Sequence, residues 1–335
     1  MIPFDYHRAL DTRSAIETVA AHPHATFLAG GTNLVDHMKL GLATPDLLVD
    51  VSRLPLDTVE ILQGGRVRIG ATVRNSDAAA HPLIRERYPA LSSALLSGAS
   101  GQIRNVATVA GNLLQRTRCV YFQDLTTPCN KRSPGTGCAA IGGYTRDHAI
   151  LGTSPHCIAT HPSDLAVALA AFDADVVVLG VNGERRVALT QLYRLPGTSP
   201  HRDTVLEHGE LITGVELPAI PVARHSTYRK VRDRASYAFA LVSVAAALAI
   251  EDGLITDARV ALGGVAHRPW RAYTVEAELH GRPTSEKTYR RAAGAELSEA
   301  LVHPGNAFKL PLVTNTLVAV LRELAWRRSG PPPAT

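Results

Sequence analysis

All four cysteines of this 335-residue chain lie in one irregular segment. They are Cys119, Cys129, Cys138 and Cys157, and the segment from Arg116 to His161 that holds them is rich in proline, glycine and threonine and has no sustained hydrophobic period. So long a stretch without secondary structure of its own is unusual inside a compact chain, and it is usually functional or held in place by a bound group. The crowding of the cysteines predicts that they share one role.

Three roles compete for these cysteines. Two disulfides would suit an oxidising compartment, although a chain of this size does not need them to hold its core. Structural zinc usually takes ligand pairs with two to four residues between them, whereas the gaps in this chain are nine, eight and eighteen residues. An iron–sulfur cluster needs four converging thiolates, which a long loop can bring from dispersed positions, and the bound metal then supplies the free energy that orders the loop. The spacing favours a cluster but leaves zinc open and does not set the cluster type.

Three histidines, His148, His156 and His161, share the segment. Histidine is a possible ligand, but each of these is better interpreted as a polar loop residue or as a support for a ligand.

Composition is that of a globular protein, with 45% hydrophobic and 19% charged residues. The net charge of +5 raises the question of a nucleic-acid partner. The basic residues are scattered, however, and the densest patch, Tyr228 to Arg234, is short and interrupted by Asp233. Aromatic residues make up only 5%, too few for base-stacking platforms. We therefore expect no nucleic-acid binding.

The sequence shows no recognisable secretory signal and no apolar run long enough to span a membrane. The residues from Met1 to His7 do not resemble a secretory signal, because no basic region is followed by an apolar one. The apolar run from Ala235 to Ile250 is shorter than the roughly 20 residues that span a bilayer. We expect this run to form a buried strand, and we expect the chain not to span a membrane.

Hydrophobic patterning predicts an α+β fold with a boundary near residues 218–222. Residues 1–55 form an α/β unit in this prediction, and residues 56–220 form a second unit that contains the loop 116–161. Residues 221–330 form a smaller domain of three strands (225–231, 237–250 and 258–264) and three helices (270–280, 285–301 and 312–327).

A double glycine, Gly30-Gly31, stands between a predicted strand from Thr26 to Ala29 and a predicted helix from Asn33 to Leu40. Glycines at such a junction let the backbone approach a ligand, and free amides at the start of a helix favour an anion such as a pyrophosphate. The spacing is not that of a dinucleotide-binding Rossmann unit. By itself the pattern is more often only an ordinary turn than a ligand site.

Two further segments have the same ambiguity. The stretch from Gly98 to Leu113 is rich in small and neutral polar residues, which suits a cofactor groove or a close-packed turn. The residues His161 to Leu165 include Pro-Ser-Asp before an apolar helix, which is ordinary helix capping.

Taken together and in order, these blocks resemble the FAD-binding subunit of the molybdenum hydroxylases, the family of xanthine dehydrogenase and carbon monoxide dehydrogenase. The resemblance covers nearly the whole chain. It rests on the segments 29–34, 101–113 and 162–165, and on Tyr228 to Val231 with Ser236 to Ala238. The cysteine-bearing loop is similar to that of the flavin subunit of periplasmic aldehyde oxidoreductases, where it carries a [4Fe–4S] cluster.

The resemblance implies a two-part FAD-binding domain of the vanillyl-alcohol-oxidase/PCMH type, with an α/β half and a half with a mixed sheet, followed by a smaller domain with a three-stranded sheet. It implies that residues 28–34 wrap the pyrophosphate, that Thr108, Gly111, Asn112 and Gln115 line the flavin, that Asp164 bonds cofactor hydroxyls and that Lys230 approaches the isoalloxazine ring. The full set of implied cofactor-binding residues is Leu28, Ala29, Gly30, Gly31, Thr32, Asn33, Leu34, Thr108, Gly111, Asn112, Gln115, Ile158, Asp164 and Lys230. The implied cluster ligands are Cys119, Cys129, Cys138 and Cys157.

The activity implied is that of an electron-transfer subunit without catalytic residues of its own. Aldehyde would be oxidised at a molybdenum cofactor in a large partner, and electrons would pass through the [2Fe–2S] clusters of a small partner to FAD and then to an external acceptor. The heterotrimer would be periplasmic by co-export with a signal-bearing partner, with a cytoplasmic location as the alternative. Two other functions remain open, namely a flavin subunit for N-heterocycles, xanthine or carbon monoxide, and a zinc-stabilised binding protein without flavin.

Overall fold

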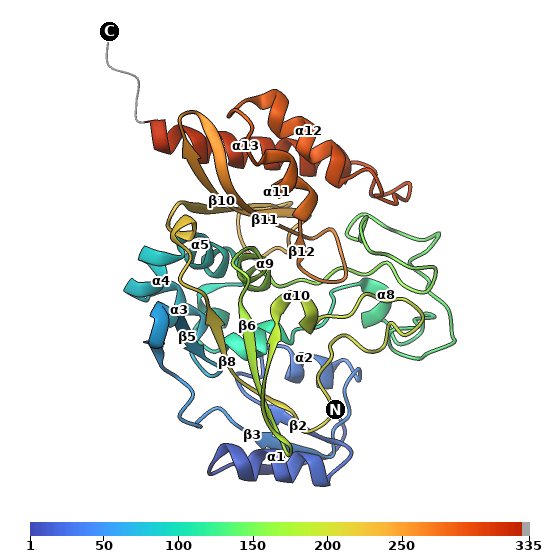
Figure 1. Cartoon of the computed structure of the whole chain (residues 1–335). Helices are drawn as coiled ribbons and strands as arrows, with labels where there is room; N and C mark the ends of the chain where they lie inside the picture. The colour runs from blue at the N-terminus through green and yellow to red at the C-terminus, as the bar shows by residue number, and fades with distance from the viewer. Residues whose placement is uncertain (330–335) are drawn as a thin grey trace.

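Three β-sheets follow one another along the chain in the computed structural model, which describes residues 1–329. The N-terminal elements lie at the bottom of Figure 1, the second sheet lies in the middle, and the third sheet with its covering helices lies at the top. Each part has a hydrophobic core of its own.

The first sheet is parallel and has the strand order β1-β3-β2. Helix α1 covers it with Ala15, Ile16 and Val19, which recur on one face at helical spacing and are buried. The elements are β1 (Asp5–Arg8), α1 (Thr12–Ala21), β2 (Ala25–Leu28), α2 (Leu34–Lys39) and β3 (Leu47–Asp50).

The second sheet has the order β4-β5-β8-β6-β7, and all of its pairings are antiparallel, so the expectation of a mixed sheet is wrong. Its strands are β4 (Val59–Ile61), β5 (Val67–Gly70), β6 (Asp175–Gly180), β7 (Gly183–Ala188) and β8 (Leu211–Leu217). The helices of this part are α3 (Asn75–Ala80), α4 (Pro82–Arg87), α5 (Pro89–Ser97), α6 (Gly101–Arg104), α7 (Val109–Leu113), α9 (Asp164–Ala171) and α10 (Leu189–Leu192), and two short 3₁₀ turns span Gln63–Gly65 and Pro221–Arg224.

Helix α9 lies at the centre of the molecule (Figure 1) and is buried along its whole length. It packs against α5 on one side and against the third sheet on the other. This position explains its composition, Asp-Leu-Ala-Val-Ala-Leu-Ala-Ala, because a helix enclosed on all sides has no polar face.

The third sheet is antiparallel and has four strands in the order β12-β11-β10-β9, which adds one short strand to the three expected. Its strands are β9 (Ser226–Val231), β10 (Val242–Glu251), β11 (Leu254–Gly263) and β12 (Trp270–Arg271), and its helices are α11 (Tyr273–Leu279), α12 (Glu286–Glu296) and α13 (Lys309–Ser329). The expected helix from Trp270 therefore begins at Tyr273, because Trp270 and Arg271 pair with β11.

Alternation along β10 explains its nearly uncharged sequence. Val244, Ala246 and Leu248 belong to the C-terminal core, whereas Ala245 and Ala247 point to the opposite face and join the core that contains α9. The expected strand from Tyr237 was too long, since β10 begins at Val242 and residues 233–237 are exposed.

The cysteine loop, residues 116–161, contains one short helix, α8 (Val120–Gln123), and is otherwise irregular, as expected. It lies at the right of Figure 1 beside α8. Buried residues attach it to the third part of the chain: Ile150 and Leu151 belong to the C-terminal core, and the fully buried Lys309 donates to the His148 carbonyl oxygen at 2.9 Å. Among residues 1–329, no helix has the length and apolar character needed to cross a membrane.

Candidate functional site

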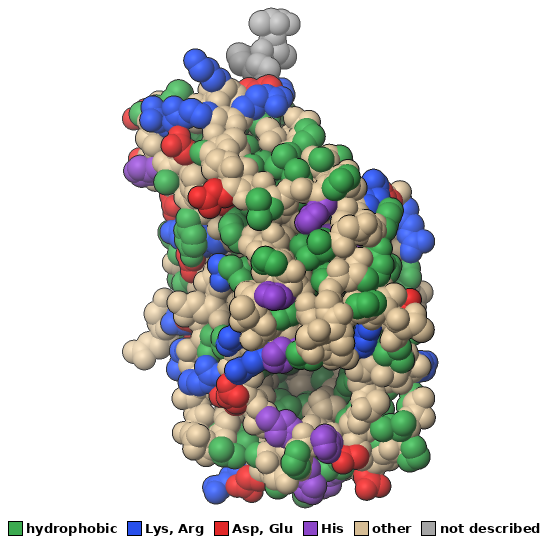
Figure 2. All heavy atoms as spheres, turned by 90° about the vertical axis from the view of Figure 1, so that its right-hand side faces the viewer, with side chains coloured by type: hydrophobic (Ala, Val, Ile, Leu, Met, Phe, Trp, Pro, Cys, Tyr) green, Lys and Arg blue, Asp and Glu red, His purple; other side chains and the backbone are tan. Residues whose placement is uncertain are grey.

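A cavity of about 720 Å³ opens where five separate segments of the chain meet. The face on the side of α8 is hollowed in its lower half, with hydrophobic and basic side chains scattered over it (Figure 2). We call the cavity the cleft. Its walls come from the start of α2, from Asn75 at the start of α3, from residues 94–123, from residues 162–165 and from residues 230–239.

Seven of the residues expected to bind the cofactor line this cleft. They are Thr32, Asn33, Gly111, Asn112, Gln115, Asp164 and Lys230. The other seven are not among the residues lining it: Leu28, Ala29, Gly30, Gly31, Leu34, Thr108 and Ile158. Thr108 is buried and caps α7 by accepting from the Gly111 amide at 3.2 Å, and Ile158 is buried within the cysteine loop. The structure thus brings together residues that are up to two hundred positions apart in the sequence.

The two glycines of the first turn serve backbone geometry. A Cβ atom on Gly30 would lie 2.2 Å from the Val106 carbonyl oxygen, so no other residue fits against the segment that leads into α7. Gly31 has a φ of +70°, a conformation that side chains rarely adopt. These glycines therefore place the first turn against residues 106–107, and Thr32 and Asn33 follow at the edge of the cleft.

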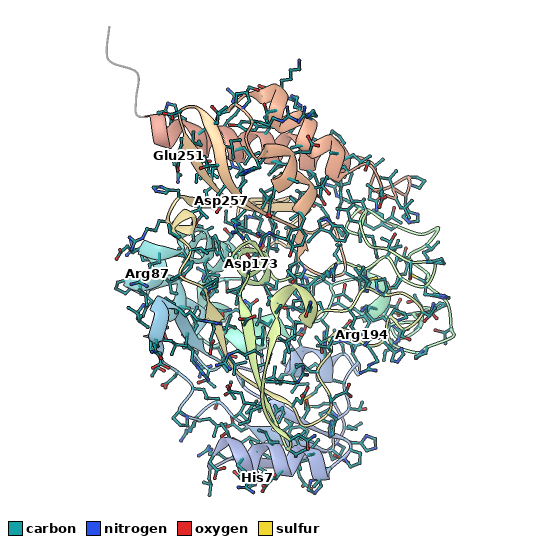
Figure 3. All side chains as sticks on the ribbon, in the orientation of Figure 1. His7, Arg87, Asp173, Arg194, Glu251 and Asp257 are labelled. Atoms are coloured by element: carbon teal, nitrogen blue, oxygen red, sulfur yellow. The ribbon has the colours of Figure 1, made fainter. Side chains whose placement is uncertain are left out.

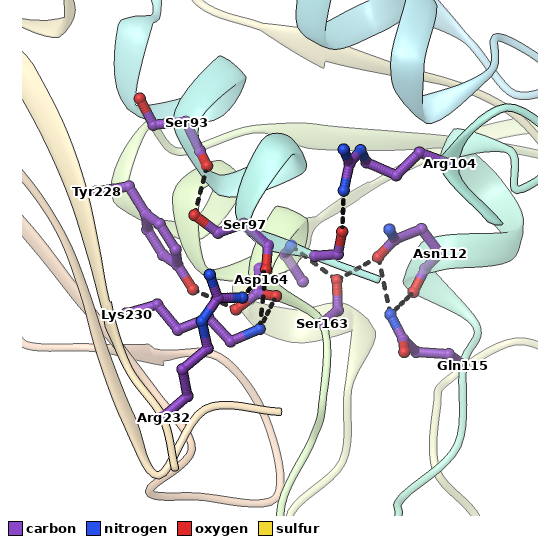
Figure 4. A network of polar contacts seen from close by, with 12 residues as sticks. Ser93, Ser97, Arg104, Asn112, Gln115, Ser163, Asp164, Tyr228, Lys230 and Arg232 are labelled. Atoms are coloured by element: carbon purple, nitrogen blue, oxygen red, sulfur yellow. Dashed lines mark hydrogen bonds and ion pairs between the residues drawn. The ribbon is translucent and has the colours of Figure 1, made fainter. Parts of the chain in front are cut away.

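A neutral hydrogen-bond network forms one wall (Figure 4). The Asn112 amide oxygen accepts from the Ser163 hydroxyl at 2.6 Å and from the Gln115 amide at 2.9 Å. Ser163 also caps α9, whose Ala166 amide donates to its hydroxyl oxygen at 3.0 Å. The ordinary capping interpretation of Ser163 is therefore correct, and the same residue fixes the orientation of Asn112.

A charged cluster around Asp164 lies next to this network (Figure 4). Lys230 donates to Asp164 Oδ2 at 2.8 Å and to the Ser97 carbonyl oxygen at 3.2 Å. Tyr228 donates its hydroxyl proton to Asp164 Oδ1 at 2.5 Å. The ammonium and carboxylate groups are almost completely buried, with side-chain exposures of 3% and 7%. Burial, together with the neighbouring carboxylate, raises the pKa of Tyr228 well above its usual value, so the phenol remains a proton donor.

Sequence reasoning assigned no role to Tyr228 or Arg232, although a signal was present. Residues 228, 230 and 232 alternate along β9 and its extension, so they share a face of the sheet with Lys230. Arg232 donates to the same Ser97 carbonyl oxygen as Lys230, at 3.0 Å. The C-terminal end of α5 is thus capped by two cations from the third sheet.

The four cysteines are free thiols that lie near one another in the loop. Cys129 and Cys138 are paired across an isolated antiparallel bridge. A hydrogen bond from Cys157 lowers the pKa of Cys138 to about 6, and the same contact raises the pKa of Cys157. Cys119 Sγ lies 3.1 Å from His148 Nε2, and burial raises the pKa of this thiol to about 11.

The disulfide interpretation is not supported by these contacts, since no cysteine is bonded to another. In the described chain no three His, Cys, Asp or Glu side chains already surround a common point at metal-ligand distance. The donor set itself, four thiols in one loop with His148 beside one of them, is the chemistry that iron–sulfur clusters and zinc require.

Comparison with known proteins gives matches along almost the whole chain. A family model described as the FAD binding domain in molybdopterin dehydrogenase matches residues 2–220, and one described as the CO dehydrogenase flavoprotein C-terminal domain matches residues 226–324.

Two curated proteins and a solved structure illustrate the similarity. The chain is 51% identical over 326 residues to the aldehyde oxidoreductase FAD-binding subunit PaoB of Escherichia coli strain K12, covering 96% of this chain and 98% of that protein. It is 27% identical over 297 residues to the glyceraldehyde dehydrogenase medium chain of Sulfolobus acidocaldarius, covering 88% of each. A carbon monoxide dehydrogenase structure from Hydrogenophaga pseudoflava superposes with a TM-score of 0.75 at 25% identity, covering 98% of this chain and 99% of that one.

These matches confirm the expected fold class, an FAD-binding domain followed by a smaller α+β domain. The chain belongs to the molybdopterin dehydrogenase family, as an FAD-binding oxidoreductase subunit that carries the C-terminal domain of the CO dehydrogenase flavoproteins.

Proposed function

We propose that this chain is the FAD-binding electron-transfer subunit of a molybdenum-dependent aldehyde oxidoreductase. The observation that carries the proposal is the cleft, in which Thr32, Asn33, Asn112, Asp164 and Lys230 converge from four segments. Its volume of about 720 Å³ is in the range of cofactor sites. The aldehyde substrate rests on the 51% identity to the E. coli subunit, whose name specifies an aldehyde oxidoreductase.

The residues of the cleft suit a flavin dinucleotide. Small residues and neutral amides, including Gly111, Asn112 and Gln115, offer hydrogen bonds with little steric obstruction. In this proposal the turn 28–34 lies along the pyrophosphate, with Leu28, Ala29, Gly30, Gly31 and Leu34 contributing backbone rather than side chains. Thr108 and Ile158 act from behind the cleft wall, Thr108 through its cap on α7.

The chain's own groups then have distinct tasks. Asp164 holds Lys230 at the wall, and each of its oxygens retains capacity to accept a further hydroxyl. Lys230 presents a buried positive charge, which favours the reduced, negatively charged form of a flavin over the oxidised form. FAD, when bound, supplies the electron-accepting chemistry, and the protein positions it and sets its electrostatics.

We propose further that Cys119, Cys129, Cys138 and Cys157 bind a [4Fe–4S] cluster. Four free thiols in one loop, two of them in cross-strand register, provide the required donors. The hydrogen bond from Cys157 lowers the pKa of Cys138 and so supports one thiolate in the loop, the form of cysteine that binds metal. The loop has little secondary structure, and a cluster would supply ordering free energy.

The partners proposed are a large molybdenum-cofactor subunit and a small [2Fe–2S] subunit, with electrons leaving FAD to an external acceptor. The family relationship supports this assembly, because matching proteins are described as medium chains or subunits. We propose a periplasmic location reached together with a signal-bearing partner, and a domain division at 1–220 and 221–330 with a further boundary near residue 55.

The proposal is tested by adding an aromatic or aliphatic aldehyde to the assembled complex. Reduction of the flavin is followed by the loss of the visible absorbance of oxidised FAD. Bleaching by aldehyde, and none by xanthine, an N-heterocycle or carbon monoxide, is the expected result. Bleaching by xanthine, an N-heterocycle or carbon monoxide, and not by aldehyde, would show that the chain belongs to a hydroxylase for that substrate. A complex that contains zinc but no flavin would contradict the electron-transfer function.

A further inference from the structure

Arg118 lies at the junction of the cleft with a second cavity of about 240 Å³ on the side of the cysteine loop. Its side chain lines both cavities, and the two also share Asp164 and Phe239 among their walls. Arg118 immediately precedes Cys119, the first of the four clustered cysteines. It therefore connects the proposed metal loop to the proposed flavin site.

The guanidinium of Arg118 makes no hydrogen bond within residues 1–329. Its Nε atom is buried without a partner, and its closest carboxylate, on Asp36, is 3.7 Å from Nη1, beyond hydrogen-bond distance. The group lies over the ring of Phe239, 5.1 Å from the centroid. Buried donors of this kind normally have a partner, so the unused donors point to a ligand.

The other cations of the cleft wall are already occupied. Arg104 and Arg234 each donate to a backbone carbonyl oxygen, and Lys230 forms the buried ion pair with Asp164. Among the described residues lining the cleft, Arg118 is thus the one cation that makes no hydrogen bond, so its guanidinium is available to an anion.

The location of Arg118 relative to the glycine turn indicates which anion it meets. Asp36 belongs to α2, the helix that follows Gly30 and Gly31. The Arg116 amide donates to the Asn33 side-chain oxygen at 3.0 Å, which joins the same loop to the start of α2. Residues 28–34 contain no charged side chain, so the turn itself offers a pyrophosphate no countercharge.

We propose that Arg118 is a further cofactor-binding residue, whose guanidinium pairs with the pyrophosphate of a flavin dinucleotide in the cleft. This inference rests on the proposed function. Arginine suits the task, because its planar fork can donate two parallel hydrogen bonds to phosphate oxygens.

The assignment couples the two proposed cofactor sites. Ordering of the loop at Cys119 fixes the backbone next to Arg118, and pairing of Arg118 with the pyrophosphate holds the loop against α2. Because such coupling is reciprocal, occupancy of either site strengthens binding at the other.

The test measures binding of FAD and of riboflavin, which lacks the phosphates, to the deflavinated full chain. Arg118→Gln is expected to weaken FAD binding about 10- to 100-fold, as for loss of a charge-assisted hydrogen bond, and to leave riboflavin binding unchanged. Arg118→Lys, which keeps the charge without the fork, is expected to lose less affinity for FAD and again none for riboflavin.

Arg146→Gln is the matched control. Arg146 belongs to the same loop, lies 4.9 Å over the ring of Phe308 and pairs with Asp233, but it does not line either cavity. This variant is expected to bind FAD as the wild type does. Equal losses of FAD and riboflavin affinity in the Arg118 variants, or no loss of either, would overturn the assignment while leaving the proposed function intact. Wild-type chain that binds no FAD would overturn both.

Discussion

Asp164 joins the two halves of the molecule at a single carboxylate. Its oxygens accept from Tyr228 and Lys230 of the third sheet, while its own backbone starts α9 in the FAD-binding half. A buried pair of this kind costs desolvation free energy that only the mutual attraction and added hydrogen bonds recover. Removal of either Asp164 or Lys230 would therefore leave the other as an uncompensated buried charge.

Replacement of Lys230 tests this dependence. Lys230→Met leaves the Asp164 carboxylate buried without its countercharge, so we expect a loss of about 3–5 kcal/mol in the free energy of unfolding in urea. Arg13→Met, which breaks an exposed helical pair with Glu17, is the control and is expected to change stability by less than about 1 kcal/mol. With FAD bound, the same Lys230 variant should lower the flavin reduction potential. Unchanged stability, flavin retention and potential would contradict both roles given to Lys230.

Buried histidines make stability depend on pH. Burial lowers the pKa of His161 to about 4 and that of His267 to about 3, both from 6.5. The unfolded chain therefore binds more protons below pH 6.5, so this stability is fully present above pH 6.5 and is lost as the pH falls toward 4. We expect each histidine to lower the free energy of unfolding by about 1 kcal/mol when the pH falls from 7 to 5.5, measured by urea unfolding at both pH values. In His267→Leu the free energy of unfolding should change less between the two pH values than in the wild type. An unaltered change would contradict a contribution from His267.

Among the helices and strands, hydrophobic periodicity predicts best those elements that bury one or both faces. The expected strand 225–231 differs from β9 by a single residue. The run from Ala235 was extended too far toward the N-terminus, since a small-residue loop and a buried strand have the same apolar composition. The short strand β12 was missed because its two residues are defined only by their pairing with β11.

A matched pair of glycine substitutions tests the packing of the first turn. Gly30→Ala places a methyl group against the backbone of Val106, so we expect it to destabilise the chain by about 1–3 kcal/mol and to weaken FAD retention. Gly101→Ala, in the first turn of α6, meets nothing within 4 Å and should be neutral or slightly stabilising. Thermal unfolding of both variants gives the comparison, and equal melting temperatures would exclude a close approach at Gly30.

Across the whole molecule, the sequence predicts the local motifs of the candidate site but not the contacts between distant segments that bring them together. The cysteine loop and the glycine turn stand out as local patterns, and seven of the expected cofactor residues reach one cleft. Tyr228 and Arg118 were left without a role, because their positions depend on contacts between segments more than sixty residues apart. Sequence patterns report neighbours along the chain. The contact of Tyr228 with Asp164 depends instead on the packing of α9 against the third sheet, and that of Arg118 with Asp36 depends on the position of the cysteine loop beside α2.

The central claim is that one chain holds both a flavin and an iron–sulfur cluster. The most direct measurement is the FAD, iron, acid-labile sulfide and zinc content of the purified chain, read together with its visible spectrum. We expect one FAD per chain and about four irons with four sulfides, the composition of a cuboid cluster bound by four cysteines. A colourless protein with zinc and no flavin would contradict it.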